Sequence, residues 1–147
     1  MMDTGGVKGG EYMVRRHAPG GTDPGRRAAA MVSPAPTREE EFLVEGELLT
    51  DVGGTLPSKV LSTPGMIQVM EWACTRLIRD HVPDAGPTVG FEVCVKHVGG
   101  APEGARCVVR ATLRDVVDGR KFRCDVEVLE ADRTIGVGTH ERRALRR

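Results

Sequence analysis

The sequence is poor in aromatic residues and carries no net charge. It contains one Trp, one Tyr and three Phe in 147 residues, and its 21 basic side chains are balanced by 21 acidic ones. Proteins that bind single-stranded nucleic acid stack the bases on aromatic side chains, and binding to nucleic acid or to anionic membranes draws on an excess of positive charge. We therefore expect neither nucleic acid nor a membrane surface as a partner.

Long hydrophobic runs are also missing. No stretch approaches the ~18 consecutive apolar residues that a membrane span requires. Residues 1–30 contain four arginines but lack the apolar block, about 7–15 residues long, of a secretory signal. These absences predict a protein that is not exported and that resides in the cytoplasm.

The cysteines are spaced too widely to indicate a metal site. Cys74, Cys94, Cys107 and Cys124 include no CxxC pair and no other short ligand spacing. We therefore predict reduced, mostly buried thiols and no bound metal, as is usual for a protein of a reducing compartment.

Periodic hydrophobic patterning begins only after residue 36. Residues 1–36 are rich in glycine, proline and arginine, and they repeat at neither the helical nor the strand period. The sequence predicts a flexible arm over residues 1–36 and one folded domain over residues 37–147, a length typical of a single core.

The folded part begins with a strand and one long helix. Hydrophobic and acidic side chains alternate over residues 38–49, which indicates a half-exposed strand. Thr63 followed by Pro64 is typical of a helix N-terminus, with Thr63 as the N-cap. Apolar residues then recur at helical spacing until about residue 81. The sequence therefore predicts a helix over residues 64–81 with one broad apolar face.

After the helix the hydrophobic period changes to two, which predicts four further strands. They cover residues 88–98, 105–117, 122–128 and 134–145, and Asp118-Gly119 suits a two-residue hairpin turn between the second and the third. The order β-α-β-β-β-β, with the last four strands in a meander, predicts an α+β protein of the hot-dog fold. In that fold a long central helix is wrapped by a curved antiparallel sheet, here of five strands.

Three polar residues stand out against the hydrophobic pattern. Glu71 lies at the edge of the apolar helix face, His97 shares a strand face with Phe91 and two valines, and Thr63 begins the helix. A carboxylate near an imidazole can share a proton with it, as general acid–base catalysis requires. Each residue also has an ordinary structural role open to it, as an exposed helix residue, a core histidine or an N-cap.

Three segments resemble the fluoroacetyl-CoA thioesterase family of single-domain hot-dog proteins: residues 70–74 (MEWAC), 94–97 (CVKH) and 135–142 (IGVGTHER). In that family a threonine at the helix entry, a helical glutamate and a histidine on the following strand are catalytic. The resemblance implies these roles for Thr63, Glu71 and His97, and it matches Gly90 to a family glycine that lines the acyl pocket. The implied activity is hydrolysis of a short acyl thioester.

The spacing of the implied catalytic residues bears on the assembly. Thr63 and Glu71 are eight residues apart, about 12 Å along one straight helix, which is beyond hydrogen-bond reach. Either the first helical turn is irregular or the site is built from two chains. The family's acyl-CoA site at a subunit interface favours the second alternative, and we expect a homodimer with two equivalent sites.

Further expectations concern how the substrate is held and attacked. Glu71 would attack the carbonyl or activate water, His97 would transfer protons, and Thr63 would hydrogen-bond the carboxylate or the intermediate. The backbone N–H groups of Gly65 and Met66, at the positive end of the helix dipole, are predicted to bind the oxyanion. No cofactor is expected beyond the coenzyme A of the substrate itself.

Two residues of the last strand receive only general expectations. His140 lacks partners at metal-ligand spacing and is expected to be structural or solvent-facing. Arg142 is one of five basic residues that could meet the CoA phosphates at the mouth of the cleft.

One departure from the family concerns the acyl group. Residues 52–62 contain no aromatic side chain, although the family has aromatic residues before the threonine that close over the small acyl group. The sequence therefore predicts a short acyl group on coenzyme A or on an acyl carrier protein, and it leaves open whether that group is fluoroacetyl or another small acyl group. Two alternative functions stay open: a hot-dog dehydratase or hydratase acting on thioesters, and a non-catalytic acyl-CoA-binding protein.

Overall fold

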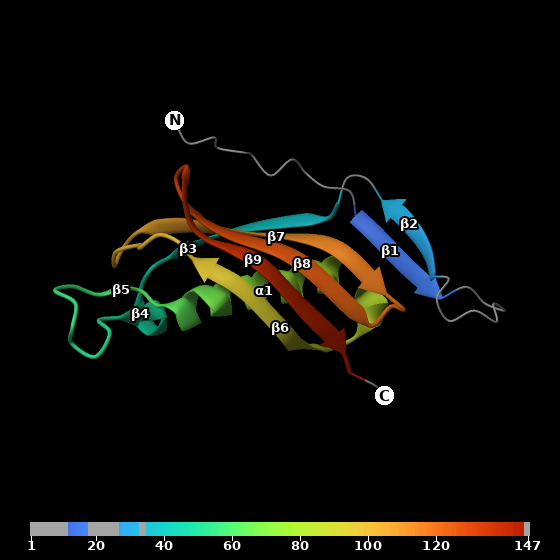
Figure 1. Cartoon of the computed structure of the whole chain (residues 1–147), viewed down its shortest axis with the longest axis horizontal. Helices are drawn as coiled ribbons and strands as arrows, with labels where there is room; N and C mark the ends of the chain where they lie inside the picture. The colour runs from blue at the N-terminus through green and yellow to red at the C-terminus, as the bar shows by residue number, and fades with distance from the viewer. Residues whose placement is uncertain (1–11, 18–26, 33–34, 146–147) are drawn as a thin grey trace.

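One long helix and a curved antiparallel sheet form the body of the protein (Figure 1). The computed structural model describes residues 12–17, 27–32 and 35–145. The helix is α1 (Thr63–His81), and two short 3-10 helices are η1 (Gly46–Leu48) and η2 (Pro83–Ala85). The strands are β1 (Tyr12–His17), β2 (Arg27–Val32), β3 (Thr37–Leu43), β4 (Leu49–Thr50), β5 (Val60–Leu61), β6 (Thr88–His97), β7 (Arg106–Val117), β8 (Lys121–Glu130) and β9 (Arg133–Ala144).

The helix begins one residue earlier than predicted. Thr63 is its first residue, and the cap is Ser62, whose hydroxyl accepts a hydrogen bond from the Gly65 N–H at 2.9 Å. The prediction that Thr63 is the N-cap is therefore wrong. Ser62 has the extended backbone that a cap needs, and Pro64 is tolerated at the second helical position because first-turn N–H groups have no intrahelical partner. The Thr63 side chain is thereby free for contacts outside the helix.

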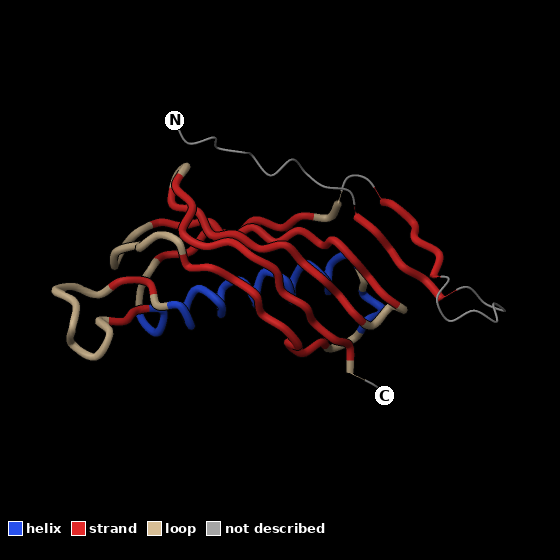
Figure 2. Tube along the Cα trace, viewed as in Figure 1, coloured by secondary structure: helices blue, strands red, loops and turns tan. Residues whose placement is uncertain are grey.

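The apolar face of α1 packs on the inner face of the sheet, beneath which the helix runs in Figure 2. The buried helix residues are Met66, Val69, Met70, Ala73, Cys74, Leu77 and Ile78, and the buried strand residues include Val109, Leu113, Phe122, Val126 and Ile135. Fully burying a side chain of the size of Leu or Phe contributes roughly 1.5–3 kcal/mol, so this layer dominates the stability. Among the residues described, no helix is long and apolar enough to cross a membrane.

The five main strands lie in the order β3-β7-β8-β9-β6, and all neighbours are antiparallel. This confirms the predicted five-stranded sheet around a central helix. The predicted four-strand meander is wrong in its first member, because β6 pairs with β9 at the far edge and not with β7. Alternation along a strand indicates which face is buried, but it does not identify the neighbouring strand.

The first predicted strand is shorter than its pattern indicates. β3 ends at Leu43, and Gly46 then adopts a φ of 59° at the start of η1. Val44 continues the hydrophobic pattern and is fully buried, but its N–H donates to the carbonyl of Ala105 outside the named strands. The hydrophobic residues at 44 and 48 therefore line the core from a turn and a 3-10 helix.

Three register shifts curve the sheet. They lie at Gly90/Glu92, Leu113/Asp115 and Val128/Leu129, and such bulges bend a strand and increase its twist. The shift in β6 turns the Phe91 ring away from the helix, where it stacks under the Arg143 guanidinium at 3.6 Å and stays 58% exposed. The prediction that Phe91 shares a face with His97 is therefore wrong.

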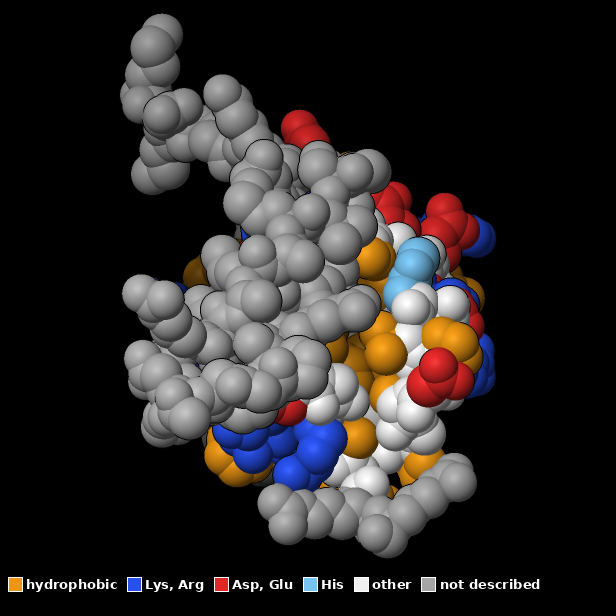
Figure 3. All heavy atoms as spheres, turned by 90° about the vertical axis from the view of Figure 1, so that its right-hand side faces the viewer, with side chains coloured by type: hydrophobic (Ala, Val, Ile, Leu, Met, Phe, Trp, Pro, Cys, Tyr) orange, Lys and Arg blue, Asp and Glu red, His pale blue; other side chains and the backbone are white. Residues whose placement is uncertain are grey.

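Two strands lie within residues 1–36, where the sequence predicts a flexible arm. β1 and β2 pair with each other antiparallel, and β1 also runs parallel to the end of β7. Neither the sequence YMVRRH of β1 nor RAAAMV of β2 alternates hydrophobic and polar residues, so the hydrophobic pattern does not predict these strands. Apart from residues 35 and 36, the rest of the arm lies outside the described residues. Figure 3 views this end of the molecule and shows hydrophobic, basic and acidic side chains side by side.

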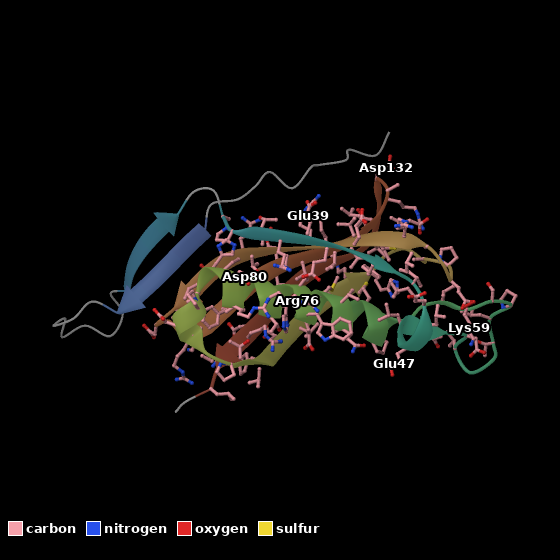
Figure 4. The ribbon with its side chains drawn as sticks, turned by 180° about the vertical axis from the view of Figure 1, so that it is seen from behind. Glu39, Glu47, Lys59, Arg76, Asp80 and Asp132 are labelled. Atoms are coloured by element: carbon pink, nitrogen blue, oxygen red, sulfur yellow. The ribbon has the colours of Figure 1, made fainter. Side chains whose placement is uncertain are left out.

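Ion pairs join the outer side of α1 to β3. Arg76 contacts Glu40 at 2.6 Å, and Arg38 contacts Asp80 at 2.6 Å; Figure 4 shows Arg76 and Asp80 on the helix. These side chains are partly exposed, so the pairs contribute little to the stability. Their main effect is to orient β3 along the helix.

Gly138 in β9 allows β6 to approach closely. A Cβ at this position would lie 2.1 Å from the Cys94 carbonyl oxygen and 2.6 Å from the Val95 Cα. Both are backbone atoms, which cannot rotate away as the tip of a side chain can. A side chain at position 138 therefore requires β6 and β9 to separate.

We expect Gly138→Ala to lower the free energy of unfolding by about 1–3 kcal/mol, because the added methyl group overpacks the contact with β6. Gly100→Ala is the matched control: no atom lies within 4 Å of its Cβ position, and its stability is expected to stay within about 0.5 kcal/mol of the wild type. Urea unfolding compares the two variants. Equal stabilities would contradict the close approach of the strands.

Candidate active site

The structure brings together two of the three predicted catalytic residues. Thr63 lies at the first position of α1 and His97 is the last residue of β6, so the helix entry meets the end of the edge strand. The Thr63 Oγ1 and the His97 Nδ1 are 2.9 Å apart, a hydrogen bond. The other ring nitrogen, Nε2, is buried and has no hydrogen-bond partner within the described part of the chain.

This pair fixes the imidazole and leaves one nitrogen available. When the Thr63 hydroxyl donates to Nδ1, the proton of the neutral ring lies on Nε2. A buried polar atom without a partner is costly in a stable fold and is a common feature of sites that bind a ligand. The arrangement suits a histidine that transfers a proton to or from a bound molecule.

Glu71 lies two helical turns further along α1 and faces a different part of β6. Its Oε1 is 2.9 Å from the position of a Cβ at Gly90, so the carboxylate occupies the space that the missing side chain leaves. The space beside it is too small to admit a water molecule, and it is lined by Ile67, Met70, Val93, Val95, Val126 and His140. Glu71 and Gly90 therefore meet each other but not the Thr63–His97 pair of the same chain.

The helix that separates these groups is regular. α1 runs unbroken from Thr63 to His81, so the eight residues between Thr63 and Glu71 span about 12 Å along its axis. The alternative of an irregular first turn is thereby removed for the described chain. The Thr63 hydroxyl bonds the His97 imidazole and not the Glu71 carboxylate of the same chain.

The two predicted oxyanion donors are already used inside the chain. The Gly65 N–H donates to the Ser62 hydroxyl, and the Met66 N–H donates to the Ser62 carbonyl, each at 2.9 Å. A Cβ at Gly65 would lie 2.7 Å from the Leu48 carbonyl oxygen, so this glycine serves close packing against η1. The geometry therefore gives these two amides a structural role in the helix start.

Two functional candidates were missed by the sequence analysis, His140 and Arg142 on β9. His140 is 1% exposed and Arg142 is 7% exposed, so neither faces solvent or the mouth of a cleft. The Arg142 guanidinium donates from Nε to the Thr88 hydroxyl at 3.0 Å and from Nη2 to the Thr88 carbonyl at 2.9 Å. Of the five basic residues that could meet the CoA phosphates, Arg142 is the one whose guanidinium is buried against β6.

The imidazole of His140 links β9 to the bulge of β6. Its Nδ1 is 3.0 Å from the Glu92 carbonyl oxygen, and its Nε2 is 3.2 Å from the Arg142 Nη1. Burial is the largest influence on its pKa and lowers it; the hydrogen bond to Glu92 and the charge of Glu71 act in the opposite direction, and Arg142 lowers it further. The net shift is downward, which favours the neutral ring.

A signal for both residues exists in the sequence. Positions 136, 138, 140, 142 and 144 alternate along β9, and Gly136, His140, Arg142 and Ala144 among them are buried. A histidine and an arginine in phase with small residues of a buried face indicate a built polar cluster, since charged side chains are rarely buried without partners.

The cysteines take no part in this site. All four are free, and all but Cys94 are buried. A hydrogen bond with Cys124, together with burial, raises the pKa of the Cys74 thiol well above its usual value. A protonated, buried thiol is a poor nucleophile. The described residues contain no group of three His, Cys, Asp or Glu side chains that could hold a metal ion.

A protein family and a known relative match this chain, and both are fluoroacetyl-CoA thioesterases. Residues 44–147 match the family described as fluoroacetyl-CoA-specific thioesterase. The fluoroacetyl-CoA thioesterase of Streptantibioticus cattleyicolor is 34% identical over 87 residues, which cover 59% of this chain and 62% of that protein. The aligned segment thus spans less than two thirds of the relative's length.

Solved structures show the same fold. A crystal structure of a phenylalanine-to-alanine mutant of the fluoroacetyl-CoA-specific thioesterase FlK, in complex with fluoroacetate and CoA, has a TM-score of 0.65 at 28% identity, covering 74% of this chain and 91% of that one. A hot-dog-like protein from Thermanaerovibrio acidaminovorans also reaches 0.65, at 18% identity, covering 74% of this chain and 80% of the other. These similarities confirm the predicted hot-dog fold.

Proposed function

The chain belongs to the fluoroacetyl-CoA-specific thioesterase family, and we propose that it hydrolyses the thioester bond of a short acyl-CoA. The matched region contains Thr63, Glu71, Gly90 and His97. The observation that carries the proposal is the hydrogen bond between Thr63 and His97, which orients the imidazole and leaves its buried Nε2 without a partner among the described residues. Hydrolysis of a thioester needs such a group to protonate the departing sulfur.

In the proposed reaction the bond between the carbonyl carbon and sulfur breaks, and a bond from that carbon to oxygen forms. Glu71 supplies the carboxylate, which either adds to the carbonyl carbon or removes a proton from the attacking water. His97, when protonated on both nitrogens, gives its Nε2 proton to the departing thiolate while its Nδ1–H donates to the Thr63 hydroxyl oxygen. Where Glu71 adds to the carbonyl, water then hydrolyses the resulting anhydride and restores the carboxylate. In either route the proton released from water returns to His97. The products are a carboxylic acid and free coenzyme A, which is part of the substrate and not a resident cofactor.

Apolar side chains around Glu71 support contact with a short acyl group. They are Ile67, Met70, Val93, Val95 and Val126. Residues 52–59, which precede the helix, are exposed and contain no aromatic side chain. We therefore do not restrict the proposed substrate to fluoroacetyl, and the same thioester chemistry applies to an acyl group carried on an acyl carrier protein.

The proposal includes a homodimer in which each site draws on both chains. Among the described strands, β6 pairs only with β9, so its outer edge is open. This edge exposes Val89, Phe91 and Val93, and an open apolar edge strand is a template for pairing with another chain. A second copy of this chain is its natural occupant because pairing of two identical strands about a two-fold axis gives a closed dimer.

The same pairing would complete the site. Gly90, beside Glu71, and His97, beside Thr63, lie seven residues apart on β6. If two β6 strands pair antiparallel about Cys94, Gly90 of one subunit lies opposite His97 of the other, because the bulge leaves Gly90 and Glu92 only one ladder step apart. The Glu71 carboxylate of one subunit would then face the Thr63–His97 pair of its partner, which no single regular helix allows.

We place this activity in the cytoplasm. The four cysteines are unpaired in the structure, and three of them are buried as thiols. Free thiols in this number support a reducing compartment.

The dimer predicts a sedimentation coefficient that corresponds to twice the mass of the chain at micromolar concentration. The reason is that an open β6 edge with exposed Val89, Phe91 and Val93 is covered when two copies pair. Analytical ultracentrifugation of the full chain checks this. A monomer that retains full thioesterase activity would contradict the shared site.

The activity itself is tested by screening short acyl-CoAs, fluoroacetyl-CoA included, for release of free coenzyme A detected with a thiol reagent. We expect Glu71→Gln and His97→Ala each to lower kcat by roughly 10²–10⁴-fold, because each removes a group that transfers protons or attacks the carbonyl. Matched controls are Glu41→Gln and His81→Ala, since both side chains are exposed and lie on β3 and at the end of α1.

The same assay separates the alternative functions. Release of thiol by the wild type and not by Glu71→Gln supports hydrolysis. A change in alkene absorbance without thiol release would indicate a dehydratase or hydratase, and tight binding without turnover would indicate a binding protein; either result would overturn the proposed function.

A further inference from the structure

A buried guanidinium and a buried imidazole lie directly behind Glu71. Arg142 is held by three contacts, two to Thr88 on β6 and one to the His140 Nε2. His140 in turn contacts the Glu92 carbonyl through Nδ1. Both side chains are at least nine-tenths buried, so these contacts are made in the interior, where hydrogen bonds and charges act more strongly than in water.

The contacts determine the tautomer of His140. A guanidinium has only N–H donors and no acceptor, so the Nε2 facing Arg142 must be the acceptor. The proton of the ring then lies on Nδ1, which donates it to the Glu92 carbonyl oxygen. Both nitrogens are therefore satisfied by the neutral ring. A second proton, on Nε2, would break the contact with Arg142 and place a cationic imidazole next to the guanidinium.

His140, Arg142 and Glu71 converge on one point of β6, the position where Gly90 lacks a side chain. A Cβ at Gly90 would lie 2.9 Å from the Glu71 Oε1, 3.6 Å from the His140 Cε1 and 3.8 Å from the Arg142 Nη1. No direct hydrogen bond joins Glu71 to Arg142. The guanidinium therefore provides a fixed positive charge next to the carboxylate, and the atom of Arg142 nearest to this point, Nη1, is the one that His140 holds.

We propose that His140 is a positioning residue that fixes the Arg142 Nη1 beside the Glu71 carboxylate through its neutral Nε2. The inference rests on the proposed function, because it takes Glu71 to be the carboxylate that reacts. Through this contact the carboxylate faces a cation that does not move as substrate binds, and a preorganised charge needs no rearrangement during the reaction.

The alternative is that His140 only ties the β6 bulge to β9 through its bond to Glu92. Two amide substitutions separate the roles, because each retains one of the two contacts of the imidazole. An Asn side chain places its N–H₂ near the Nδ1 position and retains the donor to the Glu92 carbonyl. A Gln side chain reaches the Nε2 position and retains an acceptor for the Arg142 Nη1.

The experiment measures kcat, KM and the free energy of unfolding for His140→Asn and His140→Gln on the best acyl-CoA of the wild type. We expect His140→Asn to lower kcat by roughly 10–100-fold with KM within about threefold, as is typical when a supporting hydrogen bond to a reactive group is lost. We expect His140→Gln to retain kcat within about threefold of the wild type.

The reverse ranking would show that the bond to Glu92 is the one that matters and would overturn the proposal. Equal losses of kcat in both variants, or no loss in either, would also overturn it. If the loss of kcat in each variant is proportional to its loss in the free energy of unfolding, His140 has a structural role only. This result too would contradict the inference.

A spectroscopic measurement on the wild type keeps the inference testable if a variant does not fold or if no thioester is hydrolysed. At pH 7 the ¹⁵N shifts of the His140 imidazole are expected to show a neutral ring protonated on Nδ1. The signals are assigned to His140 because they are absent from the spectrum of His140→Asn. If that variant does not fold, the coupling of the imidazole to Arg142 assigns them. A ring protonated on Nε2, or a cationic ring, would overturn the inference. The expected tautomer without any hydrolysis would overturn the proposed function alone.

Discussion

The regular geometry of one helix determines how this active site is arranged. α1 runs unbroken for 19 residues through the curve of the sheet, and its buried face permits neither a kink nor a change of register. Thr63 and Glu71 are therefore held about 12 Å apart along its axis. The helix presents one group at its N-terminus and another in its middle, and in the proposed dimer a bound thioester meets both because a second chain supplies one of them.

The edge strand β6 follows from the same constraint. Its last residue, His97, reaches the start of the helix, while Gly90, seven residues earlier, lies against the middle of the helix at Glu71. The strand has a glycine, Gly90, where Glu71 approaches it, and hydrophobic residues along its open edge. In the proposed dimer, antiparallel pairing with a second β6 exchanges the two ends, so that one strand would serve both as the wall of the site and as the interface that completes it.

The parts of the structure that depend on local pattern could be predicted from the sequence. Helical and strand periods gave the limits of α1, β7 and β9 to within a few residues, because buried faces impose their spacing on the chain. Pairing partners could not be predicted in the same way: β6 lies beside β9, which is far away in the sequence. The face of Phe91 was missed because a single bulge reverses the alternation.

Within the site, the contact between Thr63 and His97 was not predictable from spacing, and the resemblance to a family pointed only to the residues. His140 and Arg142 were overlooked because a charged side chain on a strand is usually exposed, and their burial depends on Thr88 and Glu92 of a neighbouring strand. The positions of polar groups in a core follow from long-range pairing, which the pattern of one segment does not contain.

The most direct test of a site shared between chains is a heterodimer of Glu71→Gln and His97→Ala subunits, coexpressed with different tags and purified through both. One of its two sites then combines an intact Thr63–His97 pair with an intact Glu71 from the partner subunit, whereas each homodimer lacks one group in both sites. The shared site predicts about half of the wild-type kcat per dimer. A heterodimer as inactive as the two homodimers would contradict it, because the catalytic groups would then have to come from one chain.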